Sequence, residues 1–132
     1  MSTRRYGSGG PWEETFGYSR VVAAGPFVLS AGCTSTVDGQ VVHVGDAAAQ
    51  TKEAFRIALD GLARAGARRE DVVRTRMYVV RREDAEAVGQ VHGEIFGDVR
   101  PASTMVLVAG LIDPDHLVEV EVEAYLPPPA AS

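Results

Sequence analysis

The final strand-forming segment of this 132-residue chain constrains the fold more than any other part of the sequence. Leu117 to Ala124 alternates valine with glutamate, which is typical of a β-strand with one buried and one exposed face. Glu119, Glu121 and Glu123 then share one face, spaced about 6.6 Å apart. Adjacent carboxylates at that spacing repel by about 2.5 kcal/mol at an effective dielectric constant near 20. The glutamate face therefore needs cations, water or a ligand opposite it.

The rest of the sequence predicts a simple alternation of strands and helices. Turn residues separate the strands, and a helix with apolar positions at 54, 55, 58, 59 and 62 has helical spacing. The predicted elements are strands at 18–24 and 27–32, a short third strand after a turn at 37–41, a helix capped by Asp46 and ended by Gly66, a strand at 72–80, a helix at 83–96, and strands at 100–106 and 117–124.

This order, β-β-β-α-β-α-β-β, predicts an α+β fold: a mixed β-sheet with two helices packed on one face. The opposite face carries the glutamates and has no intrachain cover. A small core and an uncovered sheet face both favour association with another subunit.

Composition predicts one domain at 12–126, a flexible N-terminal segment at 1–11 and a proline-rich tail at 127–132. The net charge of −5 argues against a nucleic-acid partner, which normally requires a basic face. Apolar runs are too short for a membrane span, and the single Cys33 excludes an internal disulfide, so we expect a cytoplasmic protein. His43 and His116 fall in predicted loops. No metal-ligand spacing or cofactor motif is apparent, so we expect neither a metal nor a cofactor.

Four segments occur in an order and spacing that resemble a known family. They are Phe16-Gly17-Tyr18-Ser19-Arg20-Val21-Val22, Leu29-Ser30-Ala31-Gly32-Cys33-Thr34, Asp71 to Val79, and a Pro101-Ala102 strand followed by the Val-Glu repeat. The family is Rid/YjgF, the reactive-intermediate deaminases also described as endoribonuclease L-PSP, and the resemblance spans Trp12 to Tyr125. It implies a chorismate-mutase-like subunit, a homotrimer and a small-molecule cleft at each subunit interface. The acidic charge disfavours the nuclease description.

One departure from the family pattern bears on the substrate. The deaminating members have an arginine after Pro-Ala that binds the substrate carboxylate, and Ser103 stands at that position here. Serine cannot reproduce the planar, bidentate contact of arginine. The family's helix asparagine and its turn glutamine align with Gly89 and Cys33, so two further polar contacts are absent. Deamination of 2-imino acids is therefore expected to be weak.

The family pattern leaves Tyr18 and one carboxylate in place. That carboxylate is Glu119, or Glu121 if the preceding loop aligns differently. Glu119 is the candidate general base for activating water, with a solvated strand-face charge as the alternative. Tyr18 is expected to shape the pocket, and backbone N–H groups near Gly32 and Ser103 to polarise the substrate.

Four further residues have both a functional and a structural interpretation. Arg74 and Arg76 share one face of the middle strand and could supply a substrate-binding cation, or they could pair with the glutamates across the strands. His92 could lie near the cleft mouth or pack simply on its helix. Cys33, at a strand end, is more readily a buried inert thiol than a nucleophile.

Two functions from different classes follow from these residues. In the first, the protein hydrolyses a neutral or cationic imine, enamine or related nitrogen compound, with Glu119 as the base. In the second, it is a non-catalytic trimer that binds a small metabolite or a protein partner.

Overall fold

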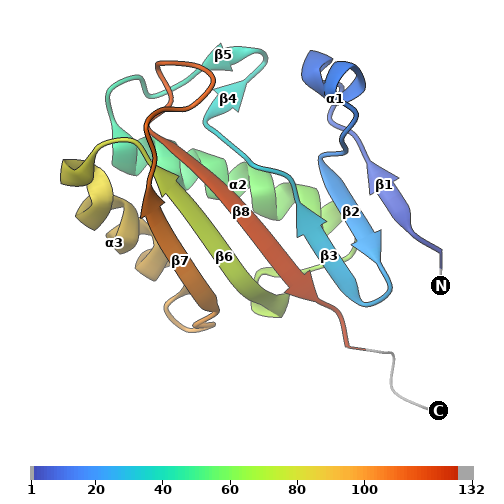
Figure 1. Cartoon of the computed structure of the whole chain (residues 1–132). Coiled ribbons are helices and arrows are strands. Elements are labelled where there is room, and N and C mark those ends of the chain that lie inside the picture. Colours follow the sequence, from blue (N-terminus) through green and yellow to red (C-terminus); the bar gives the residue numbers. More distant parts are fainter. Residues whose placement is uncertain (1, 128–132) are drawn as a thin grey trace.

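The computed structural model describes residues 2–127, whose centre is a six-stranded mixed β-sheet (Figure 1). The strand order is β1-β2-β3-β8-β6-β7. Only β6 and β7 run parallel, and every other neighbouring pair is antiparallel. The strand bounds are β1 Arg4–Tyr6, β2 Val21–Ala24, β3 Phe27–Ser30, β6 Val72–Val79, β7 Ala102–Leu107 and β8 Val118–Tyr125.

Two long helices, α2 (Ala47–Arg64) and α3 (Ala85–Phe96), cover the same face of this sheet (Figure 1). This confirms the predicted α+β architecture. A short helix, α1 (Pro11–Phe16), lies near the β1–β2 edge, and two 3-10 turns at Arg69–Asp71 and Arg82–Asp84 precede β6 and α3. Among the residues that the structure describes, no helix lies over the opposite face of the sheet.

The core lies between β8 and the helices. Val118, Val120 and Val122 are fully buried, whereas the intervening glutamates are partly exposed. Phe55 of α2 and Phe96 of α3 meet edge to face in the same core, with ring centroids 5.3 Å apart. The period-two pattern of β8 thus sets which face is buried.

The start of α2 follows the predicted cap. Asp46 accepts a hydrogen bond from the Ala49 backbone N–H at 3.0 Å, which satisfies one of the free N–H groups of the first turn. The chain leaves the helix through Gly66, whose φ of +89° is in the left-handed region that glycine adopts without strain.

The structure differs from the sequence predictions at the N-terminal side. Residues 4–6, within the segment expected to be flexible, form the edge strand β1, and the Arg64 guanidinium lies 5.4 Å from the Tyr6 ring centroid. The predicted third strand does not join the main sheet: β4 (Thr36–Val37) and β5 (Gln40–Val41) form a separate hairpin. Most of the proline-rich tail lies outside the described residues.

Within residues 2–127, no helix has the length and apolar character needed to cross a bilayer.

Candidate functional site

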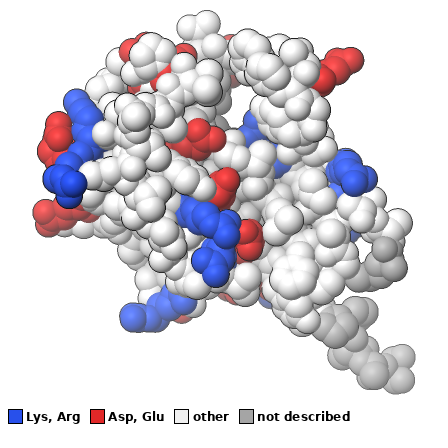
Figure 2. All heavy atoms as spheres, in the orientation of Figure 1, with Lys and Arg blue, Asp and Glu red and all other residues white. Residues whose placement is uncertain are grey.

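The glutamate row of β8 is matched by cationic and phenolic side chains of β6. Arg76 donates to Glu123 at 2.7 Å and lies 3.7 Å from Glu121, and the Tyr78 hydroxyl donates to Glu121 at 2.7 Å. Figure 2 shows these opposite charges gathered on the open face of the sheet. Cross-strand pairing is therefore the observed role of Arg76, and this pairing offsets the repulsion within the row.

Glu119 has a different environment from the other two glutamates. Among the described residues it has no hydrogen-bond partner, and its carboxylate lies against the backbone of Gly32. A Cβ on Gly32 would overlap Glu119 Oε2 and lie 2.9 Å from Cδ. Burial raises the pKa of Glu119, nearby Glu121 raises it further, and Arg20 opposes the shift. A half-buried carboxylate with a raised pKa is suited to proton transfer near neutral pH.

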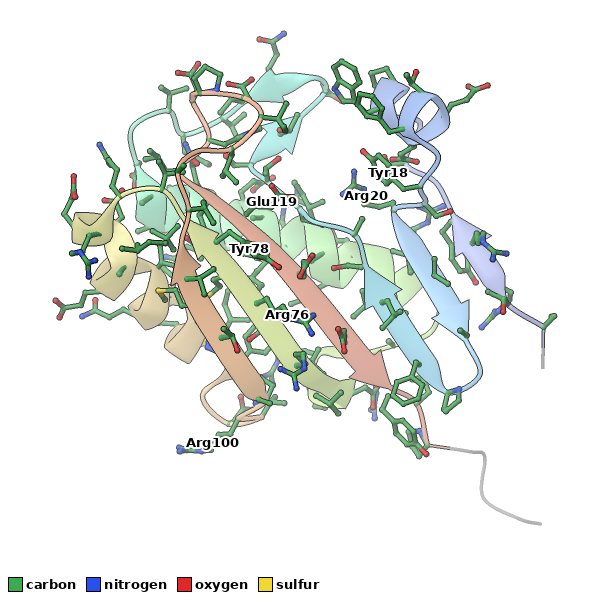
Figure 3. The ribbon with its side chains drawn as sticks, in the orientation of Figure 1. Tyr18, Arg20, Arg76, Tyr78, Arg100 and Glu119 are labelled. Carbon is green, nitrogen blue, oxygen red and sulfur yellow. The ribbon has the colours of Figure 1, made fainter. Side chains whose placement is uncertain are left out.

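Arg20, a residue not predicted from the sequence, lies between Glu119 and Tyr18 (Figure 3), and its positive charge acts on the Glu119 carboxylate. Its Nη1 donates to the Gly32 carbonyl at 2.6 Å, and its guanidinium lies 5.7 Å from the Tyr18 ring centroid. Its Nε lies 3.7 Å from Glu13. The one sequence signal for Arg20 is its spacing of two residues from Tyr18.

Glu13 is the carboxylate that faces the Arg20 guanidinium. It is 8% exposed and accepts hydrogen bonds from the backbone N–H of Ser8, at 3.0 Å, and from the Ser8 hydroxyl. Burial raises the pKa of Glu13, but the Ser8 hydrogen bonds and the Arg20 charge more than offset this, so its pKa is lowered. Glu13 therefore remains ionised and holds Arg20 in place.

Cys33 lies beside Gly32, and its environment is that of a structural thiol. Its backbone exchanges hydrogen bonds with Val120, and its thiol donates to the Ala31 carbonyl at 3.4 Å. Burial raises the pKa of Cys33, with Arg20 opposing the shift. A buried thiol with a raised pKa is a poor nucleophile.

Tyr18 lines a surface hollow of about 580 Å³ that runs from α1 to the end of β3. The hollow reaches Ala31, next to Gly32, but Glu119 is not part of its wall. Figure 2 shows the surface hollowed beside α1. The full lining is Arg5, Glu13, Glu14, Gly17, Tyr18, Ser19, Val22, Leu29, Ser30 and Ala31.

Ser103 and His92 lie away from this hollow. Ser103 is on the edge strand β7, and His92 is on α3, on the helix-covered side of the sheet. Thr75 of β6 joins them: its hydroxyl donates to Ser103 Oγ at 2.8 Å and lies 2.7 Å from His92 Nε2. His92 also contacts Phe55 and Phe96, and burial lowers its pKa. His92 thus packs on its helix and also lines a second hollow of about 310 Å³.

The structure therefore separates the predicted site residues into two groups. Tyr18, Gly32, Cys33 and Glu119 lie around the start of β2, the end of β3 and the start of β8. The second group consists of Ser103 on β7 and His92 on α3. Strand β6 separates β7 from β8. Arg76 and Glu121 lie on the open face between the two groups. Within residues 2–127, no cluster of three or more His, Cys, Asp or Glu side chains is arranged to hold a metal ion.

Comparison with known proteins identifies the class. Residues 13–126 match the family described as Endoribonuclease L-PSP, and the chain belongs to this family. The predicted resemblance to Rid/YjgF proteins is thereby confirmed.

Relatives and solved structures agree with this assignment. The chain is 46% identical over 124 residues to an uncharacterised protein of Streptomyces coelicolor, covering 94% of this chain and 92% of the relative. It is 38% identical over 89 residues to 3-aminoacrylate deaminase RutC of Acinetobacter baylyi, covering 67% and 70%. The crystal structure of Rv2704 from Mycobacterium tuberculosis, described as a member of the YjgF/YER057c/UK114 family, matches with a TM-score of 0.85 at 44% identity, covering 95% of this chain and all of that one.

Proposed function

We propose that this protein is a Rid-type hydrolase that converts a small neutral or cationic imine or enamine to a carbonyl compound and ammonia. The observation that carries the proposal is Glu119: a half-buried carboxylate with a raised pKa, set against a glycine backbone and close to an arginine. Similarity to a relative named 3-aminoacrylate deaminase supports the reaction class.

In the proposed reaction, Glu119 takes a proton from water as the water oxygen attacks the imine carbon. The imine reacts in its protonated, iminium form, so that when the carbon–nitrogen double bond becomes a single bond the electron pair neutralises the nitrogen and the tetrahedral carbon carries a hydroxyl and an uncharged amino group. The protonated Glu119 then returns its proton to the nitrogen and the carbon–nitrogen bond breaks. The hydroxyl oxygen forms the carbonyl and passes its proton to the departing ammonia, which leaves as ammonium. An enamine enters this sequence as its imine tautomer. The step needs no cofactor because water is the only co-reactant.

Assembly would complete the site. The Glu119 and Ser103 groups lie on different parts of the sheet, so one subunit does not surround a small ligand with both. We propose a homotrimer in which the β7 edge of one subunit faces the Tyr18 and Glu119 side of the next. Three equivalent clefts would follow from the symmetry.

The test is an ammonia-release assay with imines generated in situ. An amine oxidase would supply uncharged imines from primary amines, and a dehydratase would supply 2-aminoacrylate and 2-iminopropanoate. We expect faster hydrolysis of the uncharged imines and weak activity toward the two acids, because Ser103 cannot bind a carboxylate as arginine does.

Glu119→Gln should abolish the acceleration, since glutamine keeps the size of the side chain but cannot accept the proton. Glu121→Gln is the matched control and should retain activity. Activity should rise with pH through a pKa above that of an ordinary glutamate, because burial raises the pKa of Glu119 and only its ionised form is a base. Loss of activity in Glu121→Gln alone would reassign the base to Glu121.

The second candidate function, a non-catalytic binding module, is favoured by the Arg76, Glu121 and Glu123 contacts, which engage three polar groups of the open face with one another. If no imine in the panel is hydrolysed faster with the protein than without it, this function replaces the first.

A further inference from the structure

The Arg20 side chain is held by three different groups. Its Nη1 donates to the Gly32 carbonyl at 2.6 Å, its Nε lies 3.7 Å from the Glu13 carboxylate, and its guanidinium lies 5.7 Å from the Tyr18 ring centroid. Glu13 is in turn fixed by the Ser8 backbone N–H at 3.0 Å. Only 19% of the Arg20 side chain is exposed. Because arginine stays charged and its planar guanidinium is fixed by these contacts, Arg20 supplies a positive charge at a defined position.

This charge lies beside Glu119. The Glu119 carboxylate occupies the space that a Cβ on Gly32 would fill, and Arg20 donates to the carbonyl of the same residue. The two side chains therefore meet at one residue of the backbone. Burial and the Glu121 charge raise the pKa of Glu119, and Arg20 opposes both.

The other groups near Glu119 supply no positive charge. Glu121, on the same strand, is negative. Tyr78 is the cross-strand partner of Glu119 on β6, and the Cys33 thiol is close enough for the Glu119 charge to act on it. A hydrogen bond to Glu121 raises the pKa of Tyr78, and burial raises the pKa of Cys33, so both stay neutral near pH 7. Among residues 2–127, Arg20 is thus the positive group that acts on Glu119.

We propose that Arg20 is a positioning residue for the base of the reaction: its fixed charge keeps the Glu119 side chain at Gly32 and favours the ionised form that accepts a proton from water. The inference rests on the proposed function in one respect, namely that Glu119 is the base. It also gives α1 a role in the site, since Glu13 of α1 holds Arg20 in place.

Two other roles for Arg20 fit the structure less well. Arg20 does not line the hollow that contains Tyr18, and its Nη1 and Nε face the Gly32 carbonyl and Glu13, so its contacts are with the protein rather than with a ligand. A purely structural ion pair would account for Glu13 but not for the approach of Arg20 and Glu119 to the same glycine.

The test measures the pKa of Glu119 by NMR titration of its side-chain carboxyl carbon in the full-length protein, with Glu119→Gln identifying the signal. Arg20→Gln removes the charge but can still donate to the Gly32 carbonyl, so we expect its Glu119 midpoint at higher pH than in the wild type. Arg20→Lys keeps the charge and should keep the midpoint closer to the wild-type value. Arg56→Gln, which removes the same charge from an exposed position on α2, is the matched control and should not change it.

An unchanged or lower midpoint in Arg20→Gln would overturn the inference, as would an equal rise in Arg20→Lys or in Arg56→Gln. If the loss of the guanidinium beside Glu13 prevents folding, the comparison is made in a Glu13→Gln background. Adding Arg20→Gln to that background should again raise the midpoint, and no rise there would equally overturn the inference.

The pH dependence of imine hydrolysis gives a second readout. Arg20→Gln should lose activity on the acid side, because a higher pKa leaves less of the ionised Glu119 at a given pH, and should recover the wild-type rate above both midpoints. A rate lowered equally at every pH would assign Arg20 a structural or substrate-binding role and overturn the inference. If the wild type hydrolyses no imine, the proposed hydrolase fails, whereas the titration still decides whether Arg20 controls the ionisation of Glu119.

Discussion

At position 32 the structure requires a residue without a side chain. The space that a Cβ would fill is occupied by the Glu119 carboxylate, while the Gly32 carbonyl accepts from Arg20. One glycine thus brings a carboxylate and a guanidinium close to the same short stretch of backbone. The requirement is for space rather than for an unusual φ, because Gly32 does not have a positive φ.

Gly32→Ala should therefore displace the Glu119 side chain while leaving the fold intact, since the overlapping atoms are the end of a flexible side chain. We expect imine hydrolysis to fall as far as in Glu119→Gln, with a circular dichroism spectrum like that of the wild type. Ammonia-release assays on both variants would check this. Full activity in Gly32→Ala would show that the observed Glu119 position is not the one used in catalysis.

At the scale of elements, Gly93 in α3 and Gly97, the residue that caps the C-terminal end of this helix, lie about one helical turn apart but differ in their surroundings. A Cβ on Gly93 would meet nothing within 4 Å, whereas a Cβ on Gly97, at the helix end, would lie 2.5 Å from the Gly93 carbonyl oxygen. The first position tolerates a side chain and the second does not.

We predict opposite effects of alanine at these two positions. Gly93→Ala should raise the free energy of unfolding by up to about 1 kcal/mol, because alanine loses less conformational entropy in a helix. Gly97→Ala should lower it, since the backbone must shift. Urea denaturation of both variants would measure the difference, and a destabilised Gly93→Ala would contradict the helix geometry described above.

At the scale of the whole molecule, the open sheet face combines the charge row with exposed apolar residues. Phe27 and Tyr125 stack edge to face there at 5.4 Å, and Val106 on β7 is 43% exposed. An exposed surface of this mixed kind favours a protein partner, and the proposed trimer supplies one from further copies of the same chain.

Light scattering should give a mass three times the 14.0 kDa of the chain. Val106→Glu should reduce that mass by placing a charge in the proposed interface, whereas Val44→Glu, at a 62% exposed loop position, should leave it unchanged. A monomer mass for the wild type at micromolar concentration would refute the trimer.

Period-two and helical patterns predicted the sheet, the two covering helices and the Asp46 cap from the sequence, because each depends on residues close together in the chain. The face of the sheet that carries Glu119, Glu121 and Glu123 was predictable for the same reason. The strand at residues 4–6 was not predicted because three residues are too few to show a period-two pattern. These residues form a strand because they pair with β2.

The tertiary structure decided what the three glutamates contact. Sequence spacing alone treats them alike, but strand register places Glu121 and Glu123 against Arg76 and brings Glu119 against Gly32. It likewise joined Thr75, His92 and Ser103, which come from three separate elements. Local patterns determine which face a side chain occupies, whereas its partners depend on strand pairing between distant segments, and only the folded chain specifies that pairing.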